Sequence, residues 1–185
     1  MSWAVDADEV IAVLQSKLGR PIPALDAILK IVQANLTPVL QALGTELFPA
    51  SCYPKAYHYA GEYLGDAQSD RLWPKIIVAA SISTDEFGMG HTDMLQAMVT
   101  VAWPPQISRE EFQLAFDTAA AVRGILRHPQ YSGRFMDPDV PARMLWCRLL
   151  PTGFRMVPPD WQHYSGWIAQ FMAQQVPGSN LWTEP

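Results

Sequence analysis

Residues 73–83 read WPKIIVAASIS, and residues 93–103 read DMLQAMVTVAW. Both runs are apolar and rich in β-branched residues, which is the composition of strands that are buried on at least one face. The loop between them, residues 84–92 (TDEFGMGHT), is acidic and holds two glycines. Two such runs across one glycine-bearing loop predict a long antiparallel hairpin, ended by Pro104 and Pro105.

The segment after the hairpin, residues 108–127, predicts an amphipathic helix. Ser108 and Glu111 have the spacing of a capping box, in which each side chain bonds the backbone N–H of the other residue. Arg123 and Arg127 place positive charge near the C-terminal end, where it suits the helix dipole. One helical face is apolar and is expected to be buried, with Phe112, Ala115, Phe116, Ala119, Ala120, Val122 and Leu126.

Two further helices are predicted before the hairpin. Residues 6–18 begin with a capping pair of acids and continue with apolar residues at helical spacing. Residues 24–43 carry one apolar stripe, and Gly44 ends it. Pro38 lies inside this stripe, so we expect a kink there or a break into two pieces.

The remaining segments are less regular. Residues 45–71 contain four tyrosines and form an irregular connection with a short strand near 56–60. Residues 129–142 hold three prolines and predict a loop. Residues 143–150 (RMLWCRLL) are typical of a third long strand of the sheet.

The C-terminal part leaves one choice open. Residues 151–153 predict a turn, and residues 154–157 extend the preceding strand beyond it. Residues 161–176 fit a helix and an alternating strand equally well, because their aromatic residues satisfy both periods. Residues 177–185 form a polar tail.

Together these elements predict one α+β domain over residues 1–185. Its mostly antiparallel sheet contains the long hairpin and packs against one or two helices on one face. Residues 1–20 are a helical extension of this domain. The length fits a single domain, since domains typically span about 100–200 residues.

The composition is apolar for a chain of this size. Of its 185 residues 49% are hydrophobic and only 17% are charged, and seven are Trp. Either the core is large, or part of this surface is buried against other copies or neighbours, because interface centres are rich in aromatic residues and Met. No apolar run is long enough for a membrane span. The N-terminus carries acids where a signal peptide has basic residues, so we expect a soluble protein made in the cytoplasm.

The charge distribution is uneven. A net charge of −5 argues against nucleic-acid binding, which requires a basic surface. Acidic residues outnumber basic ones over residues 1–108, whereas basic residues outnumber acidic ones over residues 109–155. An acidic side and a basic side suit head-to-tail contacts around a ring, where one face of a subunit meets a different face of the next.

No catalytic or metal-binding motif stands out. The four histidines lack helical metal spacing, and Cys52 and Cys147 are too few and too distant for a disulfide framework. The acidic loop around His91 matches no calcium-loop pattern and is interpreted as a solvated hairpin tip. Cys52 and His58 lie six residues apart in a loop, which is no nucleophile signature. We therefore expect neither an enzyme nor a cofactor.

The order of the predicted elements resembles the tail terminator proteins of long-tailed bacteriophages. The resemblance runs from about Leu25 to Val176 and covers the opening amphipathic helix and the hairpin. It includes the helix ending VRGILRHP and the closing YSGWIAQFMAQQV. The first 20 residues have no counterpart in that family.

This resemblance implies a structural protein of the virion tail or neck. Such a protein forms a ring, expected to be a hexamer, that caps the tail tube and docks the head-side connector, without cofactor. Its partners are further copies, the tube protein and a neck protein, while DNA passes through the ring lumen without sequence-specific contact. The alternatives are a connector-completion or stopper protein, or a small cytoplasmic enzyme or ligand-binding domain that uses the tyrosines of residues 45–71 as a pocket.

The predicted contact residues combine the acidic hairpin loop with the basic end of the helix over 108–127. Acidic and aromatic groups at a hairpin tip are suited to docking, as a projecting hairpin is a ready contact element. These residues are Asp85, Glu86, Phe87, Met89, His91, Asp93, Arg123 and Arg127.

Overall fold

The computed structural model describes residues 23–60, 72–84, 93–157 and 164–174. Along the chain the elements are α2 (Pro23–Leu43), the short 3-10 helix η1 (Ala50–Cys52), β1 (Ala56–Tyr59), β2 (Lys75–Thr84), β3 (Asp93–Trp103), α4 (Arg109–Arg127), α5 (Pro129–Ser132), β4 (Phe135–Met136), β5 (Met144–Trp146), β6 (Arg148–Met156) and β7 (Ser165–Gln174). The predicted helix over 6–18, the extension over 1–20 and the tail over 177–185 lie outside the described residues.

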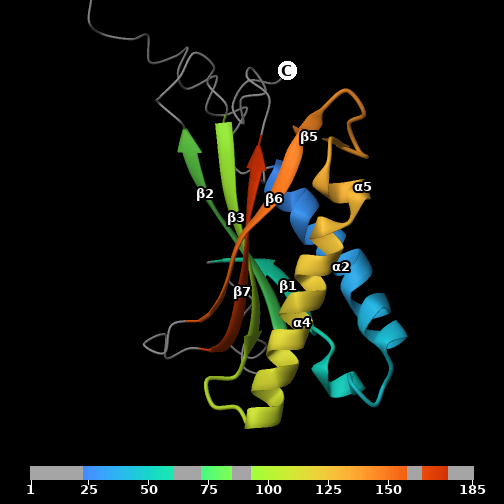
Figure 1. Ribbon diagram of the computed structural model, residues 1–185, viewed down its shortest axis with the longest axis vertical. Helices are drawn as coiled ribbons and strands as arrows, with labels where there is room; N and C mark the ends of the chain where they lie inside the picture. Colours follow the sequence, from blue (N-terminus) through green and yellow to red (C-terminus); the bar gives the residue numbers. More distant parts are fainter. Residues whose placement is uncertain (1–22, 61–71, 85–92, 158–163, 175–185) are drawn as a thin grey trace, which may run out of the picture.

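Five of the strands form one sheet in the order β1-β2-β3-β7-β6 (Figure 1). The hairpin of β2 and β3 pairs without interruption from Lys75 opposite Ala102 to Thr84 opposite Asp93. β7 pairs antiparallel with β3 and with β6, and the short edge strand β1 is parallel to β2. The predicted α+β fold with a mostly antiparallel sheet and a long hairpin is therefore confirmed.

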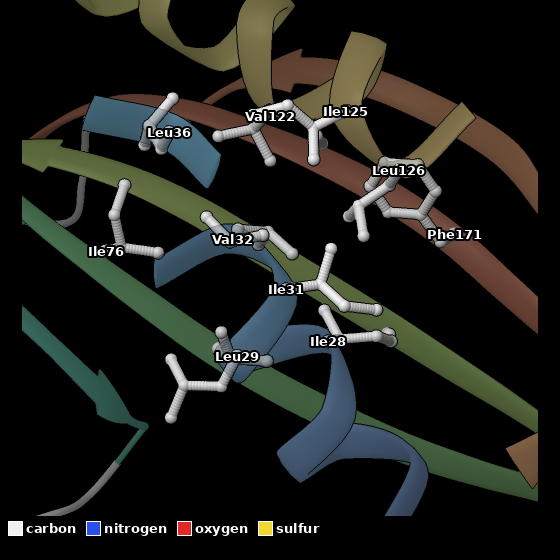
Figure 2. Close-up of a cluster of buried hydrophobic side chains, with 14 of the residues drawn as sticks. Ile28, Leu29, Ile31, Val32, Leu36, Ile76, Val122, Ile125, Leu126 and Phe171 are labelled. Atoms are coloured by element: carbon white, nitrogen blue, oxygen red, sulfur yellow. The ribbon is translucent and has the colours of Figure 1, made fainter. Parts of the chain in front are cut away.

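Both long helices lie on the same side of this sheet, as Figure 1 shows. The odd-numbered residues of β3 from Leu95 to Val101 are fully buried on that side, because side chains alternate along a strand. Figure 2 shows side chains of α2 and α4 in one cluster with Ile76 of β2 and Phe171 of β7. The predicted packing of helices on one face is confirmed.

The start of α4 is fixed by the predicted capping box. The backbone N–H of Glu111 donates to Ser108 Oγ at 3.1 Å, and the backbone N–H of Ser108 donates to Glu111 Oε2 at 2.7 Å. Two helix-terminal N–H groups are thereby satisfied at an exposed position where water would otherwise compete for them.

We expect Ser108→Ala to lower the free energy of unfolding by about 1 kcal/mol, the typical loss for removal of such a cap. The measurement is urea denaturation followed by circular dichroism. Gln106→Ala, at an exposed position just before the helix, serves as the control and should leave the midpoint unchanged. Equal midpoints for the two variants would show that the cap adds nothing.

Of the two outcomes expected at Pro38, a kink or a break, the break does not occur, because α2 continues through this residue to Leu43. A proline removes one backbone hydrogen bond and crowds the carbonyl four residues earlier, here that of Ala34. Both Pro38 and Ala34 are exposed, so water can bond the released carbonyl. Leu36 and Leu40 are fully buried on either side of the proline and hold both halves of the helix against the core.

The predicted turn at residues 151–153 is also wrong. β6 runs through it, and the only irregularity is a register shift between Pro151 and Gly153. A bulge accommodates the proline on this outer strand of the sheet, where prolines are tolerated. The predicted strand over 143–150 is in fact two strands, since β5 pairs with β4 in a separate two-stranded sheet.

The predicted loop over 129–142 holds two short elements, α5 and β4. The open choice at residues 161–176 is settled as a strand, β7, which lies between β3 and β6 near the middle of the sheet. The predicted short strand near 56–60 is confirmed as β1.

Candidate partner-binding site

A groove of about 270 Å³ lies between α4 and the outer strand β6, on the helix side of the sheet. It contains Arg123 and Arg127, two of the residues predicted to contact a partner. Its lining consists of Phe116, Ala120, Arg123, Gly124, Arg127 and Phe154. The groove therefore combines a mostly apolar lining with two basic side chains.

The helical part of this lining follows from spacing along α4. Ala120 lies four residues after Phe116, and Arg123 and Gly124 lie three and four residues after Ala120, with Arg127 the same steps further on, which places all five on one stripe of a helix. The small residues at the centre leave room between the two large ends. A Cβ added at Gly124 would have no atom within 4 Å, so this space is open.

The apolar floor belongs to a cluster of four aromatic rings. Phe116 contacts Phe154 and Trp167 edge to face, with distances between ring centroids of 5.2 Å and 4.9 Å. Phe154 stacks on Trp167 at 5.4 Å, and Phe112 lies 5.5 Å from the same tryptophan. Each ring is held by its neighbours in the geometries that aromatic pairs favour. The floor is accordingly a packed aromatic surface built from α4, β6 and β7.

The positive charge of the groove has no counterion among the described residues. The guanidinium of Arg123 lies 6.0 Å from the centre of the Phe154 ring. Its Nε is buried and has no hydrogen-bond partner, whereas most buried polar atoms in proteins have one. The ion pairs within the described part of the chain join Lys30 to Asp26 and Asp139, and Arg143 to Asp137.

The other predicted contact residues belong to the loop between the two hairpin strands and to the first position of β3. Asp85, Glu86, Phe87, Met89 and His91 lie outside the described residues. Asp93 is the first residue of β3 and stands opposite Thr84, the last residue of β2. The structure thus places Arg123 and Arg127 together in one groove.

The sequence did not identify Phe154 and Gly124 as groove residues, and it did not indicate that Ala120 is exposed. Phe116 and Ala120 were assigned to the buried face of the helix, yet Ala120 is exposed and Phe116 is half-buried. The signal for a groove was available in part, because two small residues four positions apart, Ala120 and Gly124, alternate along the helix with two arginines at the same spacing. The contribution of Phe154 depends on pairing between β6 and β7, which has no local signal.

The Cys52 and His58 pair is not assembled as a nucleophile and base. Cys52 is buried in the core cluster, and burial raises the pKa of its thiol. The neighbours of His58 in β1, Tyr57 and Tyr59, pack against the same core. His58 therefore points to the opposite face of the sheet, because side chains alternate along a strand. Its Nδ1 lies 2.9 Å from the backbone oxygen of Tyr59.

The acidic residues of the loop after β4 have structural contacts. Asp137 Oδ1 accepts the backbone N–H groups of Asp139 and Val140, and its other oxygen lies 3.3 Å from Arg143 Nη1. These bonds show that Asp137 stabilises a turn in this loop. In the part of the chain that the structure describes, no group of three or more His, Cys, Asp or Glu side chains is arranged to hold a metal ion.

The tyrosines of residues 45–60 stabilise the core. Tyr53, Tyr57 and Tyr59 pack against it, and the Tyr59 hydroxyl donates to Asp26 Oδ1 at 2.7 Å. Burial alone would raise the pKa of Asp26, but its bonds to Lys30 and Tyr59 outweigh this effect and lower the pKa. The hydrogen bond from Tyr59 to Asp26 joins β1 to α2, and all three tyrosine side chains pack against the core.

No known protein family matches the chain, and no curated protein matches it either. Among the helices of the described residues, none has the length and apolar character needed to cross a membrane. The fold and the groove are therefore the observations from which a function is proposed.

Proposed function

We propose that this protein is the subunit of a ring, a hexamer, that caps the tail tube of a long-tailed bacteriophage and joins it to the head-side neck. The observation that carries the proposal is the groove between α4 and β6. An arginine beside an aromatic floor, with a buried Nε that has no acceptor among the described residues, is typical of the centre of a protein–protein contact. In the assembled ring a protein partner would occupy this groove.

The arrangement of the elements supports the same proposal. The chain contains the opening helix, long hairpin and capped helix expected from the resemblance to tail terminator proteins, and its closing segment, for which a strand or a helix was expected, is the strand β7. Both long helices cover one face of the sheet. On the other face Met98, Gln170 and Met172 remain half-buried, and methionines are common in interfaces. A subunit of a ring between two neighbours needs several such contact surfaces.

We expect the purified chain to form particles of six times the subunit mass as its concentration rises. Mass photometry over a concentration series measures the mass, and negative-stain electron microscopy shows the rotational symmetry. A sixfold ring would support the proposal. A twelvefold ring would contradict it and favour a connector-completion or stopper protein. A monomer up to the highest soluble concentration would also contradict it and favour a ligand-binding domain.

A further inference from the structure

We propose that the groove between α4 and β6 binds the acidic hairpin segment, residues 85–92, of a second copy of this chain. The contact would repeat from subunit to subunit around the ring, so the inference rests on the proposed ring function. It names the interface that closes the ring and the residues on both of its sides.

The groove specifies the chemistry of its occupant. Neither Arg123 nor Arg127 forms an ion pair with a described residue, and within the described part of the chain the buried Nε of Arg123 has no acceptor. Charge-assisted bonds from arginine to carboxylate are among the stronger hydrogen bonds in proteins. Phe116 and Phe154 present ring surface beside these charges. The matching occupant therefore carries adjacent carboxylates followed by an aromatic or large apolar side chain.

The hairpin segment has this chemistry. Asp85 and Glu86 are adjacent and are followed by Phe87. The sequence holds one other pair of adjacent acids followed by an aromatic residue, at 110–112. That pair is already engaged, because Glu111 completes the capping box and Phe112 packs on Trp167. Charge and ring chemistry together favour residues 85–87 as the occupant.

The Phe154 part of the groove is too far from the end of the hairpin for Phe87 of the same chain to reach it. Phe154 of β6 pairs with Ala169 of β7, and Ala169 pairs in turn with Val99 of β3. Val99 is six residues from Asp93, the first residue of β3. Six residues of strand span about 20 Å, and β6 lies about 10 Å sideways from β3. Phe87 is three residues from Thr84, so its Cα reaches at most about 11 Å from that point. A second copy must supply the segment.

The geometry also explains how a ring could close. The described strands of the hairpin end at Thr84 and Asp93, at one end of the sheet, whereas the groove lies between α4 and β6. Each copy would offer its hairpin to one neighbour and its groove to the other. Such a contact between two different surfaces is heterologous, and it gives a closed ring when its rotation divides a full turn.

The test reverses the charge on each side of the contact. D85R/E86R should repel the groove, and R123E/R127E should repel the hairpin segment. We expect each variant alone to raise the concentration at which rings form on the order of 100-fold, because a charged contact that becomes repulsive loses several kcal/mol. Mass photometry over a concentration series gives this midpoint.

Mixing the two variants in equal amounts separates lost contact from lost folding. In the mixture the reversed hairpin of one variant meets the reversed groove of the other, and the two unchanged surfaces also match. Rings with an even number of subunits that alternate the two variants should therefore return near the wild-type midpoint. Failure of the mixture to assemble would overturn the proposed contact.

Two further variants serve as controls for net charge. R109E/R134E changes two exposed arginines outside the groove, and D6R/D8R changes two acids far from the hairpin in sequence. Both should assemble like the wild type, and a defect equal to that of the groove variant would overturn the inference. If the wild type forms rings but R123E/R127E assembles equally well, the groove contact alone is wrong. If the wild type never forms rings, the proposed function itself is wrong.

Discussion

Gly166→Ala is expected to lower the free energy of unfolding by about 4 kcal/mol. Gly166 has φ +149°, a conformation that residues with a Cβ rarely adopt. An added Cβ would overlap the carbonyl oxygen of Val101 and lie 3.3 Å from Ala102 Cα. Both contacts are with backbone of the adjacent strand β3, which cannot rotate away. Backbone strain and overpacking each contribute about 1–3 kcal/mol in such cases.

Urea denaturation followed by tryptophan fluorescence measures this loss. Gly124→Ala is the matched control, because its Cβ would meet no atom within 4 Å and the residue is exposed within α4. Alanine in a helix interior is favoured over glycine by about 1 kcal/mol, so the control should gain stability. The expected changes have opposite signs for the same substitution. A loss below about 1 kcal/mol for Gly166→Ala would contradict the close approach of β7 to β3.

The hairpin and α4 were predictable because their local signals agree. β2 and β3 are rich in β-branched and apolar residues and flank a loop with two glycines. α4 has a capping box at one end and a proline directly after its C-cap at the other. Each signal acts over a few residues, which is the range that a sequence pattern reports directly.

β7 was not predictable from its own residues. As a strand paired on both sides it buries Ile168 on one face and Phe171 on the other, so a simple alternation of apolar and polar residues is missing. Its partners in β3 lie about 70 residues away in the chain. The choice between helix and strand was made by this distant pairing, because tertiary contacts override local preference.

The candidate site was predictable in its charge and not in its shape. Arg123 and Arg127 stood out as basic residues at helical spacing. The groove exists because Phe154 of β6 contacts Phe116 of α4. These two residues come together because the strand order places β6 beside β7. A register shift between Pro151 and Gly153 precedes Phe154 on β6. No periodicity in the sequence reports such a shift.

Trp146→Ala is expected to have an effect of similar size in another part of the molecule. Trp146 is fully buried, stacks on Phe135 at 4.9 Å and donates its Nε1–H to the backbone oxygen of Tyr131 at 2.7 Å. It therefore joins β5, β4 and α5. Replacement of a buried tryptophan by alanine loses about 3–5 kcal/mol through lost contacts and the cavity left behind.

The hydrogen bond adds to this loss, since the carbonyl of Tyr131 would be left without its partner. Trp146→Phe separates the two effects, because it keeps a ring against Phe135 and removes only the N–H and part of the volume. We expect it to lose about 1–2 kcal/mol, mostly from the unpaired carbonyl. Alanine should lower the melting temperature by about 10 °C in a chain of this length.

The outcome for Trp146→Ala also tests whether the small sheet of β4 and β5 unfolds together with the large one. Leu145 and Trp146 belong to the same buried cluster as α2 and α4, so the loss should appear in the global transition. Hydrogen exchange of the β3 amides, which lie far from the mutation along the chain, should then speed up by about the same free energy as those of β5. Faster exchange confined to α5, β4 and β5, with β3 unchanged, would contradict this coupling. It would show that these three elements unfold locally while the five-stranded sheet remains intact.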